Sequence, residues 1–325
     1  MIELRDNALL FRFPEVHPRA TCTIDFQRTL RIPDDNREYP LPPGLGRFPV
    51  EHVDDHAARL PQSWRRHGGV FIPMYRAEAL WIDFSGHYPC AVKIAAGKID
   101  AVSGRPWTNR LSDDPQDYVV VPEQPWLDGF NVSDDHIRQF VAMPMGEGYT
   151  AEEQLTGEAR HGGLQIVVYP MKAEIYRRLG EIPDEYEEPL IMYSKSPGPE
   201  MGMAPGGLMK QKIYEDPYGL DCWDQEHGSR CFVHLVDSTL YQTITGHRPP
   251  HEPPSASQYT QAGLPWFDYY SESGAVKGAA PLAGLTGLAA KTIEKSGEPL
   301  PDNTPVEPET VQVLGGRQTV REGEF

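Results

Sequence analysis

Residues 92–102 read Val-Lys-Ile-Ala-Ala-Gly-Lys-Ile-Asp-Ala-Val, two runs of alternating apolar side chains separated by a short turn. This pattern predicts a β-hairpin with glycine at a turn position where the backbone angle φ is positive. A two-residue turn at Ala96-Gly97 would place Lys93 opposite Asp100, and such a cross-strand pair of opposite charges stabilises an antiparallel register. The segment therefore indicates an antiparallel sheet in the middle of the chain.

The sequence on both sides of this hairpin predicts further strands. Residues 9–13 and 22–26 are rich in apolar β-formers, and the valine run at 119–121 is ended by Pro122. Residues 129–132 and 137–141 flank a short polar segment and predict a second hairpin. Short strands joined by turns are thus expected to make up most of the chain.

Helical signals are few and short. Thr150-Ala-Glu-Glu153 is a capping box, which predicts a helix that ends near Gly157. The spacing of apolar residues predicts two more helices within 170–180 and 281–295. The expected fold class is therefore α+β, predominantly antiparallel β with a few short helices.

We expect residues 1–295 to form a single compact β-rich unit, with possible halves 1–145 and 146–295. Residues 296–325 are rich in proline and glutamate, and they predict a flexible tail, because they offer few apolar side chains to offset the entropy of ordering. Within this tail, residues 311–314 could still dock as a short edge strand.

The charge and composition exclude several classes of protein. Among 325 residues, 47 acidic and 30 basic side chains give a formal net charge of −17, which argues against binding to nucleic acid. The 32 prolines and 30 glycines argue against a bundle of long helices. No apolar run is long enough for a membrane-spanning helix and no secretory signal is visible, so we expect an acidic cytoplasmic protein with reduced cysteines.

One short pattern occurs twice. Residues 67–78 and 161–174 both begin with His-Gly-Gly, continue with an apolar strand and end with Ala-Glu. This similarity indicates either a duplicated β-rich half or a chance likeness between two turn–strand–helix units, and the chance likeness is favoured.

Four residues with metal-binding side chains lie close together in the sequence. Cys222, His227, Cys231 and His234 follow the spacing C-x4-H-x3-C-x2-H, and zinc accepts two cysteines and two histidines. The paired C-x2-C motif is lacking, and the strand expected at 231–236 would point Cys231 and His234 to opposite faces. The favoured interpretation is a structural thiol and a core histidine, with no cofactor, and zinc is the alternative.

A second group of residues suggests a ligand site. Glu123, Gln124, Trp126 and Asp128 lie in one turn, and together with Trp107 they offer the aromatic platform and planar polar groups typical of sugar or peptide sites. Glu123 and Asp128 could also act as an acid–base pair. The alternative is that Trp126 is a packing residue at a corner of the fold.

The segment 263–270 contains four aromatic residues in five positions. If exposed, they would form an apolar patch for a protein partner; the favoured interpretation is that they cover an open end of the β core.

Several of these motifs resemble an uncharacterised family of mainly actinobacterial proteins, some of which are loosely labelled integral membrane proteins. The resemblance covers most of the chain apart from the tail, and it carries no known activity, ligand or catalytic residue. The similar segments are 123–129, 137–144, 148–157, 161–166 and 263–269.

Two classes of function follow from the sequence. The favoured one is a soluble, non-catalytic binding or assembly protein with a protein partner or a small ligand, because the chain lacks a recognisable catalytic signature. The alternative is a hydrolase-like or metal-dependent enzyme that uses the region of Glu123 and Asp128 or the cluster from Cys222 to His234.

Overall fold

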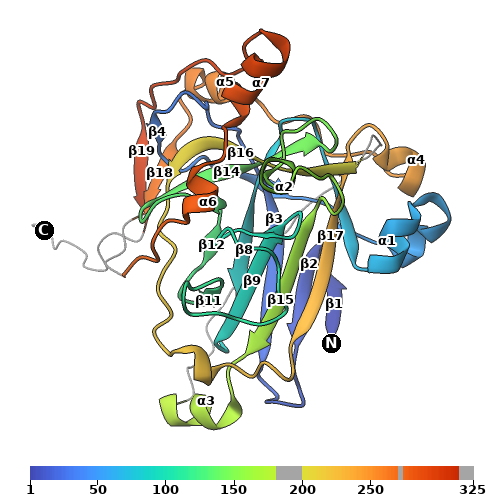
Figure 1. Ribbon diagram of the computed structural model, residues 1–325, viewed down its shortest axis with the longest axis vertical. Coiled ribbons are helices and arrows are strands. Elements are labelled where there is room, and N and C mark those ends of the chain that lie inside the picture. The colour runs from blue at the N-terminus through green and yellow to red at the C-terminus, as the bar shows by residue number, and fades with distance from the viewer. Residues whose placement is uncertain (181–199, 270–273, 315–325) are drawn as a thin grey trace, which may run out of the picture.

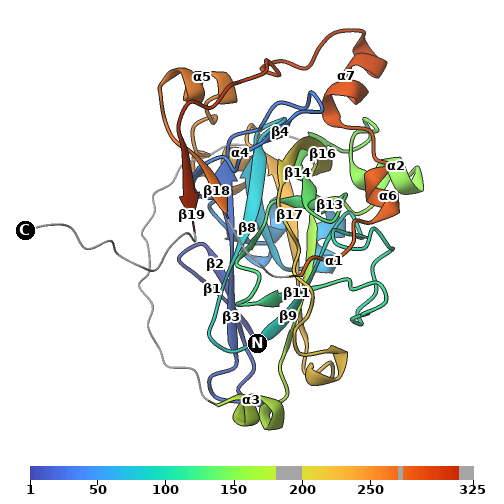
Figure 2. The ribbon, with the colours of Figure 1, turned by 90° about the vertical axis from the view of Figure 1, so that its left-hand side faces the viewer.

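The computed structural model of the chain describes residues 1–180, 200–269 and 274–314 (Figure 1). Most strands belong to one large, strongly twisted sheet, and short helices lie around its edges (Figures 1 and 2). The predicted fold class is confirmed: the fold is α+β and mostly antiparallel β.

The strands are β1 (Ile2–Arg5), β2 (Ala8–Arg12), β3 (Thr21–Thr29), β4 (Glu38–Tyr39), β5 (Gly44–Arg47), β6 (Glu51–His52), β7 (Val70–Met74), β8 (Ala79–Ser85), β9 (Cys90–Ala96), β10 (Ile99–Asp100), β11 (Val119–Val121), β12 (Trp126–Leu127), β13 (Gly129–Asn131), β14 (His136–Pro144), β15 (Leu164–Pro170), β16 (Glu200–Lys210), β17 (Ser229–Asp237), β18 (Trp266–Tyr269) and β19 (Val311–Leu314). The helices are η1 (Asp54–Arg59), α1 (Gln62–His67), α2 (Ala151–Thr156), α3 (Ala173–Leu179), η2 (Leu220–Cys222), α4 (Tyr241–Thr245), α5 (Ala256–Gln261), α6 (Ala280–Ala283) and α7 (Leu288–Ser296).

An unbroken series of antiparallel pairs connects the main sheet in the order β2–β3–β8–β14–β16–β17–β15–β9. Strand β7 adds to β17 in parallel. Strands β16, β17 and β15, from residues 146–295, lie between strands from residues 1–145, because β14 pairs with β16 and β9 with β15, and β7 adds to β17. The two segments therefore share one sheet and one main core.

The hairpin at 92–102 forms, but its predicted register is wrong. The turn lies at Gly97-Lys98, both with positive φ (58° and 65°), so Asp100 faces Ala95. A type I′ turn needs positive φ at both central positions, and this requirement moves the turn by one residue. The Lys93 ammonium instead binds Asp117, with 2.5 Å between Nζ and Oδ2.

Alternation along β3 and β8 separates the core from a polar surface. Ile24 and Phe26 of β3 and Ile82 of β8 are fully buried in the main core. The intervening residues Asp25 and Asp83 point to the opposite face of the sheet, because successive side chains of a strand alternate. This opposite face carries part of the candidate site described below.

The predicted capping box is confirmed, because the Thr150 hydroxyl accepts a hydrogen bond from the Glu153 amide. Helix α2 ends at Gly157, which has the left-handed conformation. The helix predicted within 281–295 is divided into α6 and α7, which are separated at Gly284–Gly287. In the described part of the chain, no helix is both long enough and apolar enough to cross a bilayer.

Part of the predicted tail makes contacts with the rest of the fold. Strand β19 pairs in parallel with β18, and the amide of Asp34 donates to the Asn303 side chain at 2.9 Å. The flexibility of residues 296–314 stays a prediction, and residues 315–325 lie outside the described residues.

Candidate functional site

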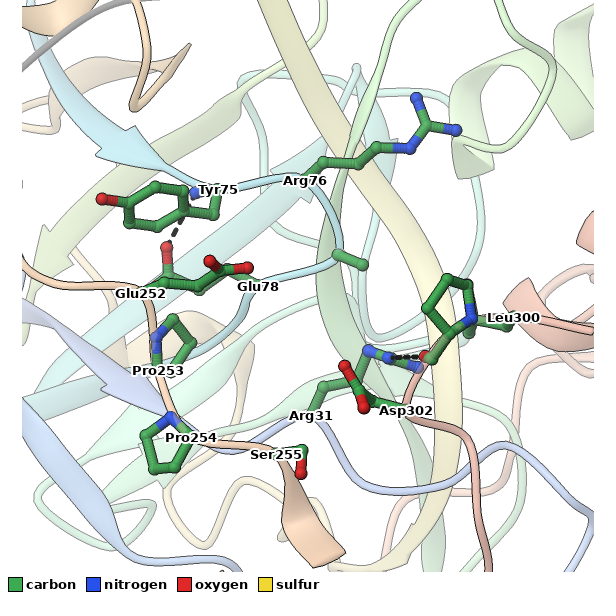
Figure 3. Close-up of a pocket in the computed structure, with 12 residues that line it drawn as sticks. Arg31, Tyr75, Arg76, Glu78, Glu252, Pro253, Pro254, Ser255, Leu300 and Asp302 are labelled. Carbon is green, nitrogen blue, oxygen red and sulfur yellow. Dashed lines mark hydrogen bonds between the residues drawn. The ribbon is translucent and has the colours of Figure 1, made fainter. Parts of the chain in front are cut away.

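A pocket of about 330 Å³ lies at the end of β3 and β8, where four segments that are distant in the sequence meet. Figure 3 shows Tyr75, Glu78 and Glu252 on one side of this pocket and Arg31 and Asp302 on the other. The complete lining is Arg31, Tyr75, Arg76, Ala77, Glu78, Glu252, Pro253, Pro254, Ser255, Leu300, Pro301 and Asp302.

The buried carboxylate of Glu78 anchors one wall. Arg28 donates to its Oε1 from Nε (2.8 Å) and Nη2 (2.6 Å), and the amide of Tyr75 donates to its Oε2 (2.8 Å). Burial raises the pKa of Glu78 to about 7, although Arg28 acts in the opposite direction. The same arginine donates to the carbonyl of His251, so this ion pair also holds the segment that leads to Glu252.

Each of the two arginines of the lining has a partner, but Nη1 of Arg31 is buried without a hydrogen-bond acceptor among the described residues. Arg31 donates from Nη2 to the Pro301 carbonyl, and burial lowers its pKa while the carboxylates of Asp302 and Asp34 act to raise it. Arg76 forms an ion pair with Glu147, with 2.8 Å between Nη2 and Oε2.

Two carboxylates of the lining have no such partner. Within the described residues, neither Glu252 nor Asp302 accepts a side-chain hydrogen bond, and Glu252 forms no ion pair at all. Asp302 lies in the electrostatic range of Arg31. Since Pro253, Pro254 and Pro301 stiffen the backbone next to these acids, the pocket presents them in a fixed frame.

Two of the six described residues other than glycine that have positive φ line this pocket. Ala77 and Asp302 both line the pocket, and both have positive φ (61° and 52°). Such a conformation costs an L-residue with a Cβ roughly 1–2 kcal/mol, and it persists at functional sites more often than elsewhere.

The sheet brings the predicted ligand residues Trp126 and Asp128 to the face opposite the core. There the indole Nε1 of Trp126 donates to Oδ2 of Asp128 at 2.6 Å, and Trp126 lies opposite Asp83 in the register of β12 and β8. We call this surface the polar face. Its members are Thr23, Asp25 and Gln27 of β3, Trp81, Asp83 and Ser85 of β8, and Trp126 and Asp128.

The three acids of the polar face have pKa values above the ordinary value of aspartate. Burial raises the pKa of Asp128 to about 7, and burial together with the charge of Asp25 raises the pKa of Asp83 to about 7. Asp25 forms an ion pair with Arg47, at 2.9 Å between Oδ2 and Nε, and burial raises its pKa as well. Asp83 accepts no hydrogen bond from the described residues, and the charge of Arg47 acts to lower its pKa.

The other predicted ligand residues lie apart from this face. Gln124 is buried, and it binds the carbonyls of Trp126 and Lys212 and the amide of Tyr214. Glu123 accepts a short hydrogen bond from the Tyr218 hydroxyl. Trp107 lies beneath Lys93 and Lys98, whose ammonium groups are 5.6 and 5.4 Å from its ring centre.

The four candidate zinc ligands do not meet. Cys231 is buried in the main core, His234 stacks on Trp64, and His227 binds Asp224. The thiol of Cys222 donates to the Tyr218 carbonyl. In the described ranges, no three His, Cys, Asp or Glu side chains are arranged to hold a metal ion.

The sequence analysis did not identify the pocket residues or Asp25 and Asp83. The alternation of residues 23–27 did carry a signal for a polar outer face, but the partner strand could not be assigned from it. The pocket gives no local signal, since it combines residues 31 and 75–78 with residues 252–255 and 300–302.

Comparisons with protein-family models, with curated proteins and with solved structures found nothing that matches this chain.

Proposed function

We propose that the chain is a non-catalytic binding protein whose pocket takes a small organic cation, such as a primary amine. The observation that carries this proposal is the pair of carboxylates, Glu252 and Asp302, that line the pocket without a hydrogen-bond donor among the described residues.

The charge balance of the lining favours a cation. Arg76 is neutralised by Glu147 and Glu78 by Arg28, which leaves one positive side chain, Arg31, against two negative ones. A positively charged ligand group would supply the missing donors, and charge-assisted hydrogen bonds to carboxylates are among the stronger ones in proteins. The net charge of −17 would also attract cations from solution.

The shape of the pocket fits a small molecule. A volume of about 330 Å³ lies at the lower end of the range of ligand pockets. Leu300 and the three prolines offer apolar contacts for a carbon skeleton, while the carboxylates would fix the charged end. The rigid backbone reduces the entropy lost on binding.

Isothermal titration with a panel of small amines, and with the corresponding carboxylic acids, tests the proposal. We expect amines to bind and acids not to bind, and we expect Glu252→Gln and Asp302→Asn each to weaken amine binding about tenfold, or 1.4 kcal/mol. Glu226→Gln, which removes an exposed acid outside the pocket, is the matched control. Binding of acids in place of amines, or equal losses in all three variants, would contradict the proposal.

The polar face favours a second candidate, a hydrolase. Asp83 and Asp128 both have pKa values raised to about 7, which suits a general acid. The ring of Trp126 is packed edge-on against Tyr269, with 4.8 Å between centroids, so the acids and not this ring carry the candidate. Nitrophenyl glycosides test this candidate: the wild type should release nitrophenol, and Asp83→Asn should lose at least 99 % of the rate, about a hundredfold. A panel without any release, or an unaffected variant, removes this candidate.

A cytoplasmic location and membership of the actinobacterial family remain parts of the proposal. The four cysteines are free thiols, which agrees with a reducing compartment. Neither part bears on the choice of ligand.

A further inference from the structure

Arg31 lines the pocket of Figure 3 with most of its hydrogen-bond donors unused. A guanidinium carries five N–H donors. Within the described residues, Arg31 donates only from Nη2, to the Pro301 carbonyl, and it forms no ion pair. Its Nη1 atom is buried without an acceptor. A buried cation without its acceptors costs free energy, so a ligand that brings an anionic oxygen to this side chain is favoured.

Asp302 lies on the same side of the pocket as Arg31, as Figure 3 shows. The carboxylates whose charges act on Arg31 are those of Asp302 and Asp34. Asp34 is occupied elsewhere: its Oδ1 is 2.9 Å from Nη1 of Arg138, and its Oδ2 accepts the amide of Ala289. Asp302 accepts no hydrogen bond from the described residues. This side of the pocket therefore offers a cation and an anion that are both open to a ligand.

Glu252 supplies a second anion on the other side of the pocket, near Tyr75 and Glu78 (Figure 3). Neither of these neighbours donates to it. The Tyr75 hydroxyl donates to the Pro250 carbonyl at 2.9 Å. Glu78 is itself an acid, and its charge is balanced by Arg28 at 2.6 Å. The pocket thus has a cation and an anion at one end and a lone anion at the other.

The rest of the lining offers little further polar chemistry. Ala77, Leu300 and the three prolines are apolar. The hydroxyl of Ser255 already accepts the amide of Gln258 at 3.2 Å, and Arg76 is in an ion pair. Such walls suit a chain of methylene groups, because apolar surface gains free energy when it leaves water.

We propose that the pocket binds a free basic amino acid, one whose side chain ends in a second ammonium group. This inference rests on the proposed function, since such a ligand is still an organic cation. Its carboxylate would accept hydrogen bonds from Arg31, its α-ammonium would donate to Asp302, and its distal ammonium would donate to Glu252. The ligand's one negative and two positive charges match the one positive and two negative side chains that the described lining leaves unpaired.

Simpler ligands would leave part of the pocket unpaired. A monoamine or a diamine brings no anion to Arg31, and an amino acid with an apolar side chain brings no cation to Glu252. An acidic amino acid would place a carboxylate against Glu252, which like-charge repulsion disfavours. The volume of about 330 Å³, at the lower end of the range for ligand pockets, suits a free amino acid.

Four probes that differ by one charged group test this inference on the full wild-type chain by isothermal titration. Lysine carries all three groups, cadaverine lacks the carboxylate, ε-aminocaproate lacks the α-ammonium, and norleucine lacks the distal ammonium. We expect lysine to bind about tenfold more tightly than each of the others. If cadaverine binds as tightly as lysine, the inference is overturned while the proposed function stands. If none of the four binds, both are overturned.

Two variants and a matched control locate the groups. Arg31→Gln should weaken lysine binding about tenfold and leave cadaverine binding unchanged, because only lysine offers a carboxylate. Arg65→Gln, which removes an exposed arginine outside the lining, should change neither. Equal losses for lysine and cadaverine in Arg31→Gln would contradict the inference. If that variant does not fold, Glu252→Gln at an exposed position carries the test: it should weaken lysine binding and leave norleucine binding unchanged, and the reverse result would overturn the inference.

Discussion

The pocket and the two His-Gly-Gly segments differ in what holds them in place. In the pocket, acids remain without partners, and the wall is anchored by the buried ion pair between Arg28 and Glu78. At the two His-Gly-Gly segments, the frame is set by close backbone contacts of Gly69 and Gly163 with β17. One region thus depends on a buried pair of charges and the other on the absence of a Cβ atom, so pH should affect the stability of the first and not of the second.

The contact at Gly163 should give the largest effect on folding. Gly163→Ala forces a Cβ atom to within 2.5 Å of the Val233 carbonyl oxygen at a position with φ of 53°, so we expect a loss of about 3 kcal/mol or more in the free energy of unfolding. Gly157→Ala is the control, because φ there is 72° and nothing lies within 4 Å; its cost should be about 1 kcal/mol. Urea unfolding measures both, and similar losses would mean that β17 does not approach so closely.

Removal of the ion pair between Arg28 and Glu78 should lower the free energy of unfolding by an amount that depends on pH. Arg28→Met leaves the buried Glu78 carboxylate without its cation, which costs about 3 kcal/mol when Glu78 is ionised. The pKa of Glu78 is raised in the folded state, from 4.5 to about 7, so the folded protein binds this proton more tightly. Stability from this group is therefore present at low pH and is lost as the pH rises from about 4.5 through about 7.

Thermal unfolding of Arg28→Met at pH 5 and at pH 8 measures this dependence. The cost should be smaller at pH 5, where Glu78 keeps its proton, and the double variant Arg28→Met, Glu78→Gln should recover part of the stability at pH 8. An equal loss of stability at both pH values would show that Arg28→Met removes packing and not charge. The two regions would then no longer differ in how their stability depends on pH.

Relief of the strained turn at Ala77 should give the smallest change in the free energy of unfolding, and this change should be an increase. Ala77→Gly relieves the positive φ of 61°, and we expect a gain of about 1 kcal/mol in the free energy of unfolding. If the strain serves the pocket, the same variant should bind amines more weakly. A variant that is less stable than the wild type would mean that the turn is not strained.

The sequence could locate the hairpin at 92–102 but not its register, because the choice of turn depended on whether Lys98 would accept a positive φ. It placed Trp126 and Asp128 together in one turn, and their contact spans two residues and is local; their role in binding stays a prediction. It could not find Asp83 beside them, since cross-strand neighbours depend on the order of strands in the sheet. The pair of Arg28 and Glu78, 50 residues apart, gave no signal for the same reason.

The pairing of early strands with late ones in the sheet has a consequence for biosynthesis. Strand β7 finds its neighbour β17 only after more than 150 further residues have left the ribosome, and β9 waits for β15. Until then, the emerging chain carries open strand edges and apolar faces that can pair with other chains. Contacts of such long sequence separation also slow folding. The nascent protein is therefore expected to depend on chaperones that cover these edges until β17 is synthesised.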